Sequence, residues 1–333
     1  MSTNLSAATL PRVAIVATGG TIAMKNDPVT GAPVPALSGA DLVAAVPGLT
    51  RLATLTVTEF ANLPSTYMGP ALWPALTRTV EELLAHDDIA GVVVLHGTDT
   101  LDQTAFFLDL TLIGDKPVVV IGAQRNASDP DGDGGRNLLN AVRQILAPGA
   151  HDMGVTVTLN HNINAAREVR KTHTNNVETF NSGDAGFLGT VDEDRVVFAR
   201  KSLRRQTLPI PAAMPRIDVV AMYAGADGAQ LRHAVDDGAD AIVVSAYGFG
   251  NVNDALHDAV AEAIAKGVVV IVASQLANGR ALPVYGFKGG GKTLRDAGAV
   301  FADDLSPDKA RVLALLALPI TRDRAALQAY FDR

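Results

Sequence analysis

Side chains able to do covalent chemistry follow several apolar segments of this chain, at the point where each segment ends. Thr21 follows the Gly-Gly pair of the segment ATGGTIA, and Thr98 and Asp99 lie in the segment HGTDT. Lys171 follows a later apolar segment. A threonine hydroxyl becomes a nucleophile when a neighbouring base or field activates it, and a lysine near an aspartate in a dry site supplies that field. Backbone N–H groups of glycine-rich turns can stabilise an oxyanion. The pattern therefore favours nucleophilic acyl transfer.

Each of these residues also has an ordinary structural interpretation. Thr21 could cap a helix, and the glycines before it could form only a turn. Asp99 could cap the helix that follows it, and Lys171 could be exposed. His96 is more often a structural hydrogen-bonding group than a catalyst. The convergence of several such residues at strand ends is what favours a shared site.

The elements that must position these residues alternate between short β-branched segments and Ala/Leu-rich segments. The predicted strands are residues 13–17, 55–59, 92–95, 118–121, 155–159, 218–222, 242–245 and 268–273. The predicted helices are residues 42–46, 72–85, 102–112, 138–145, 255–265 and 308–318, the first behind a Ser38–Asp41 capping box and the last behind Ser306-Pro307. Continuous apolar strands are typical of parallel sheets covered on both faces. The alternation predicts a doubly wound α/β fold, in which ligands bind beyond the carboxyl ends of the strands.

Composition narrows the class of protein. The chain has 333 residues, of which 48% are hydrophobic and 19% charged, so we expect a folded protein of about two domains. A formal charge of −7 and a pI near 5.5 argue against nucleic acid or an anionic membrane as a partner. The absence of cysteine excludes disulfides, a thiol nucleophile and thiolate metal sites. With no long apolar run and no signal-peptide pattern, the sequence predicts a cytoplasmic protein.

The alternation stops between residues 199 and 216. This segment holds a basic run, residues 200–205, followed by three prolines. Basic runs are usually solvated and prolines interrupt regular elements, so we interpret the segment as an exposed interdomain linker. The predicted domains are an N-terminal α/β domain, residues 1–198, with most of the catalytic residues, and a C-terminal α/β domain, residues 217–333.

The segments ATGGTIA and HGTDT resemble the two signature motifs of the bacterial L-asparaginases, the asparaginase/glutaminase family. The similarity continues through Lys116-Pro117, Gly122-Ala123, Asp133-Gly134 with Asn137-Leu138, Lys171-Thr172, Ser245-Ala246 with Asn251, and Lys309-Ala-Arg-Val-Leu313. The resemblance implies a large N-terminal α/β domain and a smaller flavodoxin-like C-terminal domain. It implies hydrolysis of L-asparagine to L-aspartate and ammonia through a threonine acyl-enzyme, with no metal and no organic cofactor. It also implies a homotetramer, a dimer of dimers with active sites between subunits.

The resemblance assigns roles by position. Thr21 matches the primary nucleophile, and Thr98, Asp99 and Lys171 match a second triad for proton transfer and the water step. The implied substrate-binding residues are Ser65, Thr66, Gly97, Ala123 and Asn251. Among these, Ser65 would hold the α-carboxylate of the substrate, and the carbonyl of Ala123 would meet the amide. Asp99 would also hold the α-amino group, and Asn251 would reach the site from the partner subunit.

Three departures from the family pattern bear on specificity. Residues 22–36 contain no tyrosine to hydrogen-bond the nucleophile, and Tyr67, a candidate substitute, is expected to pack. Thr66 stands where a glutamine is usual, and the late loop GFKGGGK lacks the glutamate that often faces the substrate. The sequence therefore leaves open a glutaminase, another ammonia-releasing amidase, or an amino-acid sensor that binds without catalysis.

Two further motifs suggest other classes of site. Residues 286–293 satisfy the P-loop pattern for nucleotides, but Pro283 interrupts the preceding segment and Gly298 shortens the following one, which favours a glycine-rich lid or subunit-contact loop. Residues 129–134 begin like a calcium loop, but position twelve is Asn140, which favours an acidic turn. The histidines lack metal-ligand spacing, and no G-x-S-x-G elbow is present, so we expect neither a metal site nor a serine hydrolase.

Overall fold

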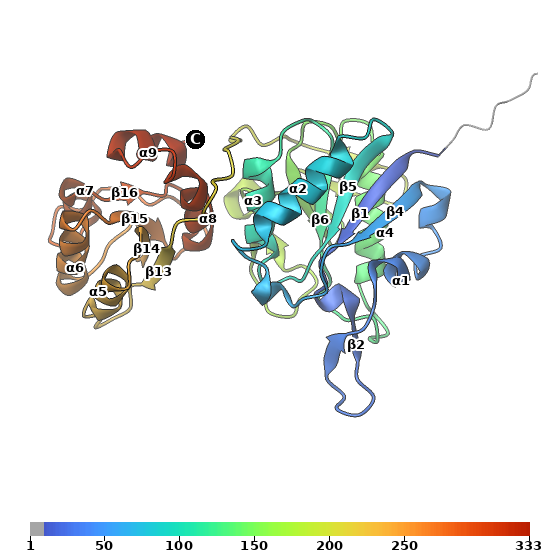
Figure 1. The fold of residues 1–333 in the computed structure, drawn as a ribbon, viewed down its shortest axis with the longest axis horizontal. Coiled ribbons are helices and arrows are strands. Elements are labelled where there is room, and N and C mark those ends of the chain that lie inside the picture. Colours follow the sequence, from blue (N-terminus) through green and yellow to red (C-terminus); the bar gives the residue numbers. More distant parts are fainter. Residues whose placement is uncertain (1–9) are drawn as a thin grey trace, which may run out of the picture. The chain divides into compact units, whose positions relative to one another are not determined.

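The computed structural model describes residues 10–333, which divide into two compact units. Unit 1 comprises residues 10–182 with Gly186–Leu203, and unit 2 comprises Gly183–Ala185 with Arg204–Arg333 (Figure 1). The main boundary lies between Leu203 and Arg204, inside the segment 199–216. That segment contains no helix or strand.

Unit 1 is built on an eight-stranded mixed sheet of order β12-β11-β8-β7-β6-β5-β1-β4. Its strands are β1 (Arg12–Ala17), β4 (Thr54–Glu59), β5 (Ile89–Leu95), β6 (Val118–Ile121), β7 (Val155–Leu159), β8 (Asn162–Ala165), β11 (Gly189–Val191) and β12 (Val196–Phe198). The five strands from β4 to β7 are parallel, and the other three extend the sheet antiparallel. The chain runs from β1 to β4 on one side and then crosses to β5 on the other. This reversal places the topological switch point, where α/β sheets bind ligands, between β1 and β5.

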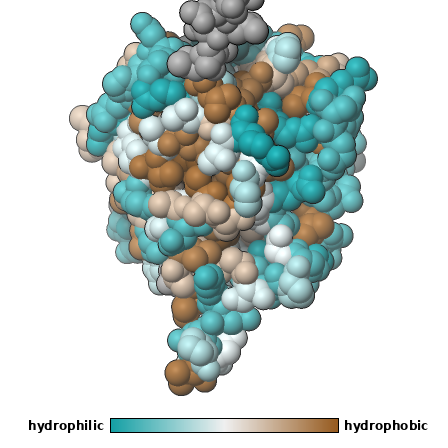
Figure 2. Space-filling view, turned by 90° about the vertical axis from the view of Figure 1, so that its right-hand side faces the viewer, coloured by the Kyte–Doolittle hydropathy of each residue, from teal (hydrophilic) through white to brown (hydrophobic). Residues whose placement is uncertain are grey.

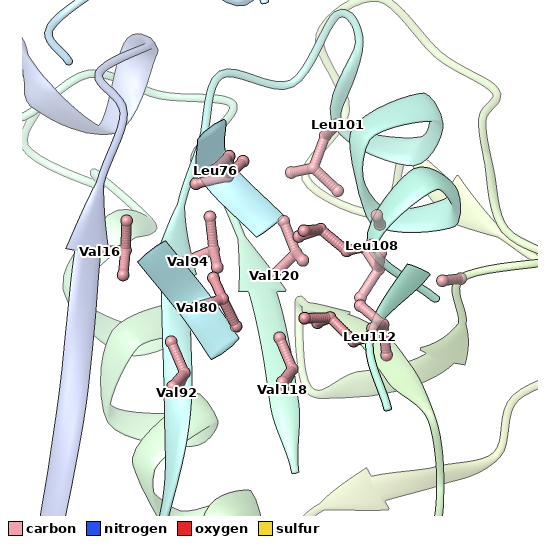
Figure 3. Packing of buried hydrophobic residues seen from close by; sticks show 14 of the residues in the cluster. Val16, Leu76, Val80, Val92, Val94, Leu101, Leu108, Leu112, Val118 and Val120 are labelled. Atoms are coloured by element: carbon pink, nitrogen blue, oxygen red, sulfur yellow. The ribbon is translucent and has the colours of Figure 1, made fainter. Parts of the chain in front are cut away.

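Helices cover both faces of the parallel strands, which is why the central strands β1, β5 and β6 are almost entirely apolar, whereas β4 at the sheet edge and β7 also contain threonines. The helices are α2 (Trp73–Leu84) and α3 (Leu101–Thr111) on one face, and α1 (Gly39–Ala44) and α4 (Gly134–Ile145) on the other. Side chains of a strand point alternately to the two faces. Val92 and Val94 accordingly pack towards α2 and α3, as Figure 3 shows, whereas Val93 and Leu95 belong to the core beneath α4.

Short hairpins and turns, which the strand periodicity did not predict, complete unit 1. They are the hairpin of β2 (Met24–Asn26) and β3 (Pro33–Pro35), the hairpin of β9 (Arg170–Lys171) and β10 (Phe180–Asn181), and the single turn η2 (Leu49–Arg51). The β2–β3 hairpin projects from the unit in Figure 1 and forms the narrow extension at the bottom of Figure 2.

Unit 2 is a four-stranded parallel sheet of order β13-β14-β15-β16, flanked by helices. Its elements are η4 (Gly183–Ala185), β13 (Ile217–Ala221), α5 (Ala229–Asp236), β14 (Ala241–Ala246), α6 (Asp254–Ala265), β15 (Val269–Ser274), α7 (Gly291–Ala297), β16 (Val300–Phe301), α8 (Pro307–Ala317) and α9 (Arg324–Phe331). The predicted fold class, a large and a smaller α/β unit, is confirmed. Among the described residues no helix is both long and apolar enough to cross a bilayer.

Two arginines of the basic run near the unit boundary form ion pairs. Arg200 forms a partly buried ion pair with Glu168, at 2.5 Å between Nη2 and Oε2. Arg204 binds the buried carboxylate of Asp303 at 2.7 Å. Arg200 and Arg204 therefore each pair with a carboxylate of their own unit.

Candidate active site

The loops after β1, β4 and β5 are packed backbone against backbone at the switch point. A Cβ atom built on Gly20 would lie 2.2 Å from the Cα of Gly97, and one built on Gly97 would lie 2.9 Å from Ser65 Oγ. Gly20 also has φ of 88°, in the left-handed region that favours glycine. Because no side chain fits at either position, these glycines bring the segments ATGGTIA and HGTDT into direct contact.

Thr21 opens the 3-10 turn η1 (Thr21–Ala23), directly after this contact. The residue in the cap position is Gly20, which has no side chain to bond the turn, so Thr21 is not the cap that its sequence position allowed. Its side chain is half-buried, and its hydroxyl has no hydrogen bond to any residue between 10 and 333. Ile22 anchors the turn by packing against Gly134; a Cβ atom built on Gly134 would lie 2.8 Å from Ile22 Cγ1. A free hydroxyl on a fixed turn suits a nucleophile.

Lys171, Thr98 and Asp99 form one hydrogen-bonded group. The Lys171 ammonium donates to Thr98 Oγ1 at 2.9 Å and to Asp99 Oδ1 at 2.7 Å. Thr98 is buried, the Lys171 side chain is 19% exposed and that of Asp99 is 62% exposed. The group therefore runs from a buried hydroxyl to an accessible carboxylate. A lysine placed this way can exchange a proton with the Thr98 hydroxyl, while Asp99 offers a negative charge to a ligand.

Ser65 joins the same group through the turn η3 (Ser65–Tyr67). The Asp99 N–H donates to Ser65 Oγ at 3.2 Å, and Thr100 Oγ1 donates to the Ser65 carbonyl at 2.6 Å. Ser65 is buried, whereas Thr66 beside it is exposed. Tyr67 is 70% exposed, so the expectation that it packs is wrong. The turn directs its serine inwards and its next two side chains outwards.

Ala123 lies in the loop after β6, which an acidic turn holds in place. Asn137 Nδ2 donates to the Gly122 carbonyl at 3.0 Å, and the carboxylate of Asp133 accepts the N–H groups of Gln124 and Arg125. The acidic segment thus forms a turn whose Asp133 side chain holds the backbone of the Ala123 loop. In the described part of the chain no group of three histidine, aspartate or glutamate residues could hold a metal ion.

His96 supports the HGTDT loop from the core. It is fully buried, and its Nδ1 donates to the Gly97 carbonyl at 2.7 Å. Burial lowers the pKa of His96 to about 4, so the ring is neutral near neutral pH. Nε2 is buried and has no hydrogen-bond partner among residues 10–333. The ring is therefore a buried support of the Gly97 peptide.

Asn251 belongs to unit 2, in the loop after β14. Its Oδ1 accepts the Gly291 N–H at 3.3 Å, and its backbone forms a bridge with Tyr247. The structure joins Thr98, Asp99, Lys171, Ser65 and Gly97 by direct contacts in unit 1, with Thr21 next to the Gly20–Gly97 contact. It describes Asn251 only within its own unit.

The P-loop pattern of residues 286–293 does not form a P-loop. No strand leads into it, and α7, which begins at Gly291 inside the pattern, is a short helix. Lys288 is paired with Asp258, and Lys292 with Asp296, both on the surface. The Thr293 hydroxyl donates to the Gly290 carbonyl at 2.9 Å. The groups that would bind phosphate are thus engaged locally.

Sequence reasoning missed two residues that hold the Lys171 hairpin. Gln124 Nε2 donates to the carbonyls of Thr174 and Asn176, both at 3.3 Å, which links the Ala123 loop to this hairpin. The His173 ring accepts backbone N–H groups of the same turn. Gln124 follows Ala123 directly, but its role depends on contacts with residues about 50 positions away, and no sequence motif indicates such contacts.

Comparison with known proteins identifies relatives over nearly the whole chain. Residues 12–204 match the family described as Asparaginase, N-terminal, and residues 216–331 match the Glutaminase/Asparaginase C-terminal domain. L-asparaginase 2 of Bacillus subtilis is 35% identical over 97% of this chain and 86% of its own length. Glutaminase-asparaginase of Pseudomonas fluorescens is 32% identical, over 97% and 90%. The crystal structure of a probable cytoplasmic L-asparaginase from Campylobacter jejuni has a TM-score of 0.88 at 34% identity and covers 97% of this chain and 99% of that one.

Proposed function

The chain belongs to the asparaginase family, and from that membership we propose that it hydrolyses the side-chain amide of L-asparagine through an acyl-enzyme on Thr21. The observation that carries the proposal is the Lys171 ammonium bound to both Thr98 and Asp99, in the loop that packs against the glycine before Thr21. Two threonines at one switch point, one free and one bonded to lysine, suit a reaction with two successive nucleophilic steps.

In the first step Thr21 Oγ attacks the amide carbon. The C–O bond forms, the C–N bond breaks, and ammonia leaves with the proton that the hydroxyl gave up. Backbone N–H groups of the glycine-rich turns around Gly20 and Gly97 stabilise the developing oxyanion. In the second step a water attacks the ester carbon, the C–O bond to Thr21 breaks, and L-aspartate leaves. The proton of the water is relayed through Thr98 and Lys171 to Thr21 Oγ, which regains its hydroxyl.

The remaining residues hold the substrate. Ser65 and Thr66 bind the α-carboxylate, Asp99 binds the α-amino group, and the Ala123 carbonyl accepts from the amide. The 62% exposure of the Asp99 side chain supports its role, because a carboxylate must be accessible to pair with a ligand cation.

The proposal includes a homotetramer in which Asn251 of the partner subunit completes the site. Exposed aromatic rings in unit 2 support an assembly: Phe249, Tyr285 and Phe287 form a chain with centroid separations of 6.2 and 5.8 Å, and each is at least 42% exposed. A cytoplasmic location is proposed from the likeness to the Campylobacter jejuni protein.

A glutaminase activity is the second candidate. It is favoured by the likeness to glutaminase-asparaginase and by the lysine-containing loop GFKGGGK, which lacks an acidic side chain to restrict the α-amino pocket. A sensor that binds amino acids without catalysis is the third, because no tyrosine follows Thr21 in the β2–β3 hairpin.

Ammonia release from L-asparagine and from L-glutamine tests these candidates, with Thr21→Ala and Thr21→Ser compared to the unmodified protein. We expect release from asparagine, its loss in Thr21→Ala with a retained thermal shift on adding asparagine, and partial activity in Thr21→Ser. Near-normal turnover by Thr21→Ala would remove Thr21 as the nucleophile. A thermal shift without ammonia from either amide would favour the sensor.

A further inference from the structure

The hairpin that carries Lys171 is closed by a histidine ring. The N–H groups of Asn175 and Asn176 donate to Nδ1 of His173, at 3.0 and 2.8 Å. The ring nitrogen thus serves as a local cap for the turn between β9 and β10. His173 is exposed, so solvent protons reach it freely.

This arrangement requires one protonation state. A ring nitrogen accepts hydrogen bonds only when it carries no proton, so Nδ1 is unprotonated and any ring N–H is at Nε2. In the doubly protonated ring Nδ1 becomes a donor and would face two backbone donors. Protonation of His173 therefore breaks both bonds at once.

The turn is coupled to Lys171 by a short chain of contacts. Thr179 Oγ1 accepts the His173 N–H at 3.0 Å, and the Thr172 N–H donates to the Thr179 carbonyl at 2.7 Å. The next pair of the ladder is Lys171 with Phe180. The ladder itself is only two residues long, so it has little strength of its own.

A second restraint reaches the same turn from the Ala123 loop. Gln124 Nε2 donates to the carbonyls of Thr174 and Asn176, the latter next to an N–H that the ring accepts. When the ring is neutral, the turn presents these carbonyls to Gln124. When the ring releases the turn, the link to the Ala123 loop weakens with it.

We propose that His173 is a positioning residue for Lys171, and that its neutral ring keeps the Lys171 ammonium on Thr98, so that acid loosens the hairpin and lowers turnover. The inference rests on the proposed amide hydrolysis. Charged groups around the hairpin are Arg170, Lys171 and Glu178 on the hairpin itself, Asp99 across from Lys171, and Arg125 and Asp133 beside Gln124. None of them accepts the two N–H groups that the ring accepts.

The test compares His173→Asn, His173→Ala and the matched surface control His86→Asn, as full-length protein. Asparagine is the informative substitution because its side-chain oxygen accepts N–H groups two and three residues on and does not titrate. We measure kcat and KM for ammonia release between about pH 5.5 and about pH 8, the range in which histidines change charge. Amide protection factors of residues 175 and 176 are measured over the same range.

At the alkaline end His173→Asn should keep most of the wild-type kcat, while His173→Ala should lose about ten- to a hundredfold, as misplaced catalytic groups do. At the acid end His173→Asn should retain a larger share of its activity than the wild type and His86→Asn. The two protection factors should fall with acid in the wild type and stay constant in His173→Asn.

Superimposable pH profiles for His173→Asn and the wild type would overturn the inference, as would protection factors that do not respond to pH. If the wild type releases no ammonia, the proposed function fails. The protection factors then decide separately whether the ring controls the hairpin, so the two failures are distinguishable.

Discussion

Replacing Lys171 with methionine separates the chemical role of this residue from any structural role. Methionine has a similar length and fits the same half-buried space, but it removes the ammonium that donates to Thr98 Oγ1 and Asp99 Oδ1. If Lys171 moves a proton during the reaction, its loss should lower kcat by about 10²- to 10⁴-fold, which corresponds to about 3–5 kcal/mol in the barrier.

The stability of the fold should change far less. Asp99 is 62% exposed, and an ion pair with one such partner contributes at most about 1 kcal/mol. Thr98 should keep its place because it is buried itself and lies in the loop that directly follows the buried strand β5. The expected rise in the activation barrier is thus several times the expected loss of folding free energy.

The assay is steady-state ammonia release together with urea unfolding of the same preparations. Lys171→Arg is the informative control, because arginine keeps the charge and the donors but does not give up its proton. We expect Lys171→Arg to be nearly as impaired in kcat as Lys171→Met. A rate within about threefold of wild type in either variant would refute proton transfer by Lys171, since that is below the range for removal of an acid–base group.

Two further predictions concern the loops that hold the site. Gly20→Ala should lose about 3–5 kcal/mol of stability or fail to fold, because its Cβ would lie 2.2 Å from the Gly97 Cα at a φ of 88°. The control Gly31→Ala has a φ of 70° but open space around the new Cβ, so it should lose only about 1 kcal/mol. Equal losses of the two variants in urea unfolding would contradict this prediction. Burial lowers the pKa of His96 from 6.5 to about 4, so between these pH values the unfolded chain binds more protons than the folded protein. The free energy of unfolding should therefore fall by about 2 kcal/mol from about pH 8 to about pH 5. In His96→Gln this contribution to the pH dependence of stability should be absent.

The parallel strands could be predicted because their residues are mostly apolar or β-branched: β5 and β6 are apolar throughout, and β4 and β7 alternate apolar residues with threonine. Residues 118–121 and 155–159 are the observed limits of β6 and β7, and the others differ by a few residues at their ends. The Ser38–Asp41 capping box is present, and Ser306 caps α8, because in both cases a local side chain satisfies the first backbone donors. These signals are local, which is why a single sequence contains them.

Elements stabilised by distant contacts could not be predicted in the same way. The strands β9 and β10 have two residues each and no periodicity. In the β2–β3 hairpin, the Asn26 N–H donates a hydrogen bond to Ser128 Oγ, which lies about a hundred residues away in sequence. Tyr67 was expected to pack because it follows a strand, but the turn η3 directs it outwards. Tertiary geometry decided each case.

For the candidate site, the sequence placed residues at strand ends, and the structure supplies their contacts. Lys171 lies 73 positions after Thr98 in the sequence, so no spacing rule predicts the 2.9 Å between their atoms. Gln124 and His173 bind backbone groups, and such bonds depend on the conformation of the partner rather than on its residue type.

The three chemical groups of the site are held with unequal strength, and this orders the effects of substitutions. Thr98 follows a central strand, and Thr21 directly follows Gly20, whose backbone packs against the backbone of Gly97 with no space for a side chain. Lys171 depends on a two-residue ladder and a few side-chain bonds to an exposed turn. Local opening is easiest where few buried contacts hold a segment. Changes in the Lys171 hairpin should therefore lower turnover without lowering global stability, whereas changes at Gly20 or Gly97 should lower both together.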